Sequence, residues 1–154
     1  MPAIFGMACA AYVLCHLAGV PWSGEPVSQP LSKEYHRLLK ELLEREEATF
    51  GDDCPPFQLD LDDAVYITRE LWRGFSARHM KRTLAPGGQK GFTRKIANLT
   101  MARWDNARPP SVDNVVLLTH DEADAHAHTS MEELRAKEPE WVAWVEAVLD
   151  HARR

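Results

Sequence analysis

Apolar residues recur every three or four positions in two stretches of the chain, the spacing of an amphipathic helix. Within residues 31–50 these positions are Leu31, Tyr35, Leu38, Leu39, Leu42 and Leu43. Within residues 61–75 they are Leu61, Ala64, Val65, Thr68, Leu71, Trp72 and Phe75. Gly51 is placed to end the first helix, and Asp60 or Asp62 to cap the second. We therefore expect two long helices, the second fraying near Gly74 or continuing to about Met80.

The pattern is weaker in the next part of the chain. Phe92, Ile96, Leu99 and Trp104 suggest a shorter helix that ends before residues 109–110, both prolines. Its outward positions would be basic, loosely similar to the second helix of a helix-turn-helix. Residues 115–118 form an apolar run that fits either a buried strand or a helical turn, and we favour the helix.

The end of the chain carries clearer signals. Ser130 and Glu133 have the spacing of a capping box, and Pro139 suits the first position of a last helix. The inner face of that helix would be Trp141, Trp144, Val145, Val148 and Leu149.

Residues 2–22 contain no acidic or basic side chain apart from His16, so a membrane span or a secretory signal has to be weighed. No Lys or Arg precedes the apolar run, and none follows it until Lys33. We therefore favour a buried core helix that ends near Gly19 over a membrane segment. The same segment could also join two copies of the chain into a homo-oligomer.

Composition indicates one small soluble domain. The chain has 154 residues, of which 45% are hydrophobic, and three cysteines without CxxC spacing, which fits a reducing compartment and a cytoplasmic location. The predicted fold is mainly α, an irregular bundle of five to seven helices joined by Pro/Gly-rich loops, with one short strand near 115–118 as an option. Within a single domain over 1–154 we distinguish an apolar helix (1–22), a basic segment (69–108), an acidic, His-rich connection (111–128) and C-terminal helices (130–154).

The basic segment is the most informative feature. The whole chain has a net charge of −5, yet residues 69–108 hold ten basic and two acidic residues, a net charge of +8. The candidate residues for binding an anionic partner are Arg73, Arg78, Lys81, Arg82, Lys90, Arg94, Lys95 and Arg103. Interleaved aromatic residues would suit nucleic acid, because bases stack on their rings. An acidic protein surface is a second candidate partner, and neutralisation by acidic helices of the same fold is the alternative to any external partner.

A second cluster lies at residues 120–128. On a helix, His120, Asp124 and His128 would share one face and could hold a divalent metal. No other ligand is indicated nearby, so an exposed acidic connection without metal is the expectation. A small metal-dependent hydrolase remains the alternative function.

The chain contains no GxSxG, HExxH, Walker-type loop or GxGxxG motif. We therefore predict a non-enzymatic binding or accessory protein that uses its basic central segment to hold an anionic partner, and that needs no cofactor.

Overall fold

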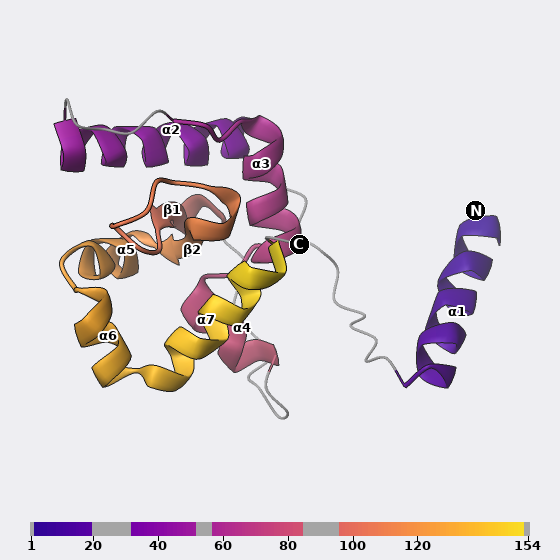
Figure 1. The fold of residues 1–154 in the computed structure, drawn as a ribbon. Helices are drawn as coiled ribbons and strands as arrows, with labels where there is room; N and C mark the ends of the chain where they lie inside the picture. Colours follow the sequence, from indigo (N-terminus) through magenta and orange to yellow (C-terminus); the bar gives the residue numbers. More distant parts are fainter. Residues whose placement is uncertain (1, 20–31, 52–56, 85–95, 153–154) are drawn as a thin grey trace.

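The computed structural model describes residues 2–19, 32–51, 57–84 and 96–152. These residues form seven α-helices and one two-stranded antiparallel sheet, which confirms the mainly α prediction (Figure 1). The helices are α1 (Pro2–Leu17), α2 (Ser32–Phe50), α3 (Leu61–Tyr66), α4 (Ala77–Leu84), α5 (His120–Ala127), α6 (Met131–Lys137) and α7 (Pro139–Ala152). The strands are β1 (Leu99–Arg103) and β2 (Val115–Thr119).

Helix α2 forms where the first apolar pattern predicts it. Leu38 and Leu42, one turn apart, are fully buried, and the helix packs on β1 and α3 (Figure 1). Gly51, the predicted stop, has a φ of +53°, a conformation that costs glycine little. The apolar periodicity and the predicted stop at Gly51 thus both match the observed helix.

The second predicted long helix is broken in two. Asp60 caps α3 as expected: its carboxylate accepts from the Asp63 N–H at 2.9 Å, and Asp63 returns the bond. A π-helical turn (Ile67–Leu71) then extends α3 as far as Trp72. Arg73 and Gly74 follow with φ values of +52° and +73°, which a right-handed helix cannot contain. The chain therefore turns, and α4 begins as a separate helix.

A β-hairpin lies at the centre of the fold. β1 pairs with β2 so that Leu99 lies opposite Thr119 and Arg103 opposite Val115. The helix predicted from residues 92–104 is thus wrong over its second half, and so is the preference for helix at 115–118, where the strand alternative is confirmed. All five residues of β1 are buried. A strand buried on both faces shows no polar alternation, so its sequence resembles part of a buried helix.

The C-terminal helices begin at the predicted residues. The Ser130 hydroxyl accepts from the Glu133 N–H at 3.2 Å, but the Glu133 carboxylate pairs with Lys137 instead of closing the capping box. Pro139 is the first residue of α7, whose Trp141 and Val145 are buried as predicted.

Tryptophan side chains connect the layers of the core. The Trp72 indole, fully buried, donates to the Val115 carbonyl of β2 at 3.1 Å and meets Trp144 of α7 edge-on. The Trp141 indole donates to the Ala77 carbonyl at the start of α4. These bonds satisfy polar edges of side chains that are otherwise packed in apolar surroundings.

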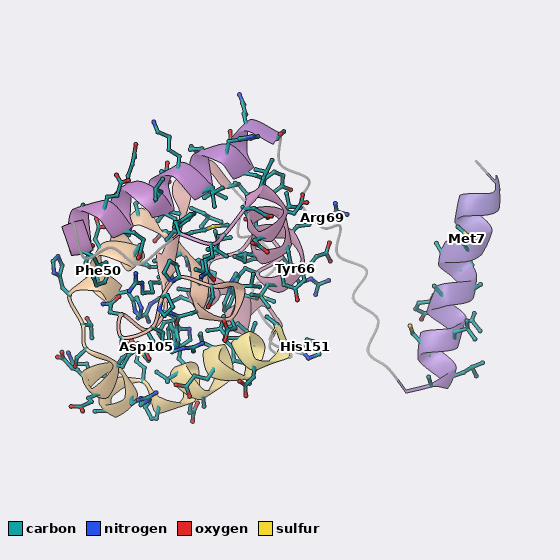
Figure 2. All side chains as sticks on the ribbon, turned by 45° about the horizontal axis from the view of Figure 1, so that its top comes forward. Met7, Phe50, Tyr66, Arg69, Asp105 and His151 are labelled. Carbon is teal, nitrogen blue, oxygen red and sulfur yellow. The ribbon has the colours of Figure 1, made fainter. Side chains whose placement is uncertain are left out.

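Helix α1 lies apart from the rest of the described chain (Figures 1 and 2). The predicted helix forms, but its apolar side chains are exposed instead of buried: Met7 is 70% and Leu17 77% exposed. The helix is apolar around its circumference, so it has no polar face to present to water. Among the described helices, none is both long and apolar enough to cross a membrane.

Candidate functional site

Arg103, one of the predicted anion-binding residues, is engaged inside the fold. It is 5% exposed at the end of β1, where its guanidinium forms a salt bridge with Glu46 of α2, itself 2% exposed. The guanidinium also lies over the Phe50 ring, 4.1 Å from its centroid, and donates to the Asn106 carbonyl at 3.1 Å. Arg103 therefore connects α2 to the hairpin and presents no charge to an external partner.

Other cations of the basic segment also have carboxylate partners. Arg78 of α4 makes two hydrogen bonds to Glu138, at 3.0 and 2.8 Å, and its guanidinium lies over the Trp141 ring. Arg69 pairs with its neighbour Glu70, and Arg108 with Asp113 at 2.6 Å. For these residues the structure agrees with neutralisation within the fold.

Arg73 is half-buried at the turn after the π-helical segment, and it too has an interaction within the fold. The side chains of the five remaining candidates lie outside the described residues: Lys81, Arg82, Lys90, Arg94 and Lys95. Lys81 and Arg82 belong to the second half of α4 and the other three follow this helix in the sequence, in a run from residue 71 to 104 that contains no acidic residue.

The histidine and aspartate cluster lies on α5, as its spacing predicts. His120, Asp124 and His128 are all exposed. Arg45 of α2 donates to the Asp124 carboxylate at 2.8 Å, and this bond together with its charge holds the pKa of Asp124 below its ordinary value. Among the described residues, no group of three His, Cys, Asp or Glu side chains is arranged to hold a metal ion.

His126, on the opposite side of α5, is a core residue. It is 6% exposed, stacks on Trp104, and its Nε2 lies 2.8 Å from the Trp104 carbonyl and 3.1 Å from the Arg103 carbonyl. Burial lowers the pKa of His126 and outweighs these two carbonyls, which act to raise it. The ring is therefore neutral at physiological pH, with Nε2 as the donor.

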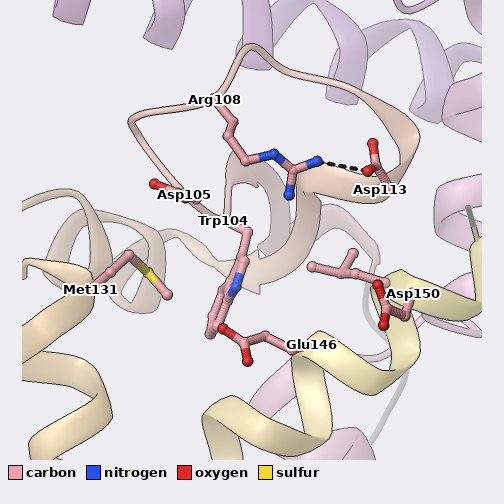
Figure 3. A pocket seen from close by; sticks show the side chains of 8 residues that line it. Trp104, Asp105, Arg108, Asp113, Met131, Glu146 and Asp150 are labelled. Carbon is pink, nitrogen blue, oxygen red and sulfur yellow. Dashed lines mark hydrogen bonds and ion pairs between the residues drawn. The ribbon is translucent and has the colours of Figure 1, made fainter.

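A polar pocket of about 220 Å³ was not anticipated from the sequence (Figure 3). It lies between the β1–β2 loop, α6 and α7. Its lining residues are Trp104, Asp105, Arg108, Asp113, Met131, Glu146, Leu149 and Asp150. Burial alone would raise the pKa of Asp113, but hydrogen bonds from Ser111 and Arg108 hold it below its ordinary value. These residues come from three separate parts of the chain, so no local motif could have revealed them.

Comparison with known proteins shows similarity to curated proteins of yeast. No protein-family model matches the chain. It is 28% identical over 127 residues to tRNA threonylcarbamoyladenosine dehydratase 1 of Saccharomyces cerevisiae (strain ATCC 204508 / S288c), a stretch that covers 82% of this chain and 26% of the relative. It is 25% identical over 126 residues to tRNA threonylcarbamoyladenosine dehydratase 2 of the same organism, covering 82% of this chain and 25% of that protein. The chain thus resembles two proteins that are named for an activity on tRNA. It spans about a quarter of the length of each.

Proposed function

We propose that this chain is a non-enzymatic accessory protein that holds tRNA through the five basic residues following the middle of α4: Lys81, Arg82, Lys90, Arg94 and Lys95. Between nucleic acid and an acidic protein surface, the similarity to two proteins named for tRNA modification favours nucleic acid. The dehydratase activity in those names belongs to proteins about three times as long, of which this chain matches about a quarter, so our proposal extends to RNA binding alone.

The observation that carries the proposal is the concentration of positive charge in residues 81–95. Arg69, Arg78, Arg103 and Arg108 each have a carboxylate partner in the described fold. The five proposed residues lie within fifteen positions of one another, in a stretch without any Asp or Glu. A phosphate backbone is the kind of partner that such a concentration of positive charge attracts.

A titration of bulk yeast tRNA against the full chain at 50 and 200 mM salt tests the proposal. Each phosphate neutralised by a cation releases a counterion, so binding weakens as salt rises. For about five contacts, a slope near −0.9 per contact on logarithmic axes gives a loss of roughly 500-fold between these salt concentrations.

Charge reversal locates the contacts. Arg94→Glu combined with Lys95→Glu should weaken binding at 50 mM salt and reduce the salt slope by about 2. Lys33→Glu combined with Lys40→Glu changes the net charge equally on exposed positions of α2 and should leave binding nearly unchanged. Equal losses in both variants would show that net charge alone acts, and absence of binding at 50 mM salt would leave an acidic protein as the partner to seek.

A further inference from the structure

The polar pocket beside β1 separates acceptor groups from donor groups. Glu146 and Asp150 of α7 lie on one side of it, while Trp104 and Arg108 project toward it from the end of β1 and the following loop (Figure 3). At about 220 Å³ it is smaller than the roughly 300–1,000 Å³ of pockets for drug-sized ligands. Its size therefore suits a small metabolite.

The acceptor side carries two carboxylates, of which only Glu146 has an ion-pair partner among the described residues. Asp150 is exposed, and no hydrogen bond or ion pair joins it to the described residues. One carboxylate oxygen of Glu146 forms an ion pair with Arg135 at 2.9 Å, and Arg135 does not line the pocket. A cationic group entering the pocket would meet these oxygens.

The donor side includes an indole N–H that is open to the pocket. Trp104 is 3% exposed and lines the pocket, and its indole N–H donates to no acceptor among the described residues (Figure 3). The indole nitrogen is not itself buried, so an oxygen of a bound molecule could accept from it. Arg108 directs one nitrogen to Asp113 and another toward the pocket (Figure 3). Both groups would bind an anionic oxygen.

We propose that this pocket binds a small zwitterion of the α-amino acid class. Its ammonium group would lie against Asp150 and Glu146, and its carboxylate would accept from the Trp104 N–H and Arg108. Met131 and Leu149 provide apolar lining, which suits an aliphatic side chain. The proposal is independent of RNA binding, because none of these residues belongs to the five proposed RNA contacts.

Nuclear magnetic resonance of the ¹⁵N-labelled full chain tests the proposal directly. The chain has five tryptophans and hence five indole N–H signals, and the Trp104 signal is identified by its loss in Trp104→Phe. Titration with L-leucine should move that signal to saturation. Matched probes that lack one charge, 4-methylpentanoate and 3-methylbutylamine, should bind about tenfold more weakly or worse, because each loses hydrogen bonds to charged groups.

Variants separate the pocket from the rest of the surface. Asp150→Asn should weaken L-leucine binding about tenfold, whereas Asp121→Asn, the same change at an exposed position of α5, should leave it unchanged. Absence of any shift with L-leucine would overturn the proposal. Equal affinity for 3-methylbutylamine would also overturn it, since the pocket would then bind cations through its carboxylates alone.

Discussion

The buried salt bridge between Glu46 and Arg103 makes a quantitative prediction for Glu46→Gln. This change removes the negative charge while keeping the shape of the side chain. Arg103 stays protonated in proteins, so its charge would remain in a site that is 95% shielded from water. The amide oxygen of the substituted side chain would accept one neutral hydrogen bond, and the Phe50 ring and the Asn106 carbonyl would be the other contacts left to Arg103.

The size of the effect follows from burial. Breaking a buried ion pair by removing one partner costs about 3–5 kcal/mol, whereas exposed pairs contribute only about 0.2–1 kcal/mol. Glu46 and Arg103 are 2% and 5% exposed, so the larger range applies. With a urea dependence of about 2 kcal/mol per molar, a loss of about 4 kcal/mol moves the unfolding midpoint down by about 2 M.

Urea unfolding followed by circular dichroism measures this shift. Glu47→Gln, the same substitution at the exposed neighbouring position, should stay within about 0.5 kcal/mol of the parent. The double variant Glu46→Gln/Arg103→Met removes both charges and should recover most of the stability lost by Glu46→Gln. A cost below about 1 kcal/mol for Glu46→Gln, or no recovery in the double variant, would refute the structural role of Arg103.

Three further predictions concern α5 and the loop between the strands. The pKa of His126 is lowered in the folded chain from its ordinary value of 6.5, so at pH values between the two only the unfolded chain binds the proton. As the pH decreases from 6.5 through this window, the free energy of unfolding should decrease by at most about 1.4 kcal/mol per pH unit. His126→Gln should flatten that fall in urea titrations, and an unchanged pH profile would contradict the assignment. The Asn114 carboxamide is fully buried; it accepts from the Asp105 N–H and donates to the Asp105, Arg108 and Pro109 carbonyls. Asn114→Ala should therefore lower the free energy of unfolding by about 2–4 kcal/mol. A loss below about 1 kcal/mol in calorimetry would argue against this role of Asn114. Added zinc or manganese should leave the melting temperature unchanged, because the Asp124 carboxylate is already hydrogen-bonded to Arg45. A clear rise in the melting temperature would instead support a metal site at His120, Asp124 and His128.

Local signals predicted the helix boundaries well where a single residue type determines the backbone. Asp60, Ser130 and Pro139 begin helices at the expected residues, and Gly51 adopts the left-handed conformation expected after α2. Each of these signals acts through bonds or dihedral angles within a few residues. Such interactions are readable without knowledge of the rest of the fold.

Long-range packing decided the features that sequence patterns missed. β1 is a strand because β2 lies beside it and α2 covers it, and neither neighbour is evident from residues 99–103. Arg103 was grouped with the anion-binding candidates because its partner Glu46 lies 57 residues away in the chain. The pocket around Trp104 likewise combines residues from the β1–β2 loop, α6 and α7, so only the folded chain reveals it.

The exposure of α1 bears on the fate of the protein inside a cell. A helix with Met7 and Leu17 open to water is a ready target for chaperones and for the proteases that remove unassembled chains. The rest of the described fold has its own buried core and gives no such signal. Any partner that covered α1 would therefore raise the cellular abundance of this protein without changing the stability of the core.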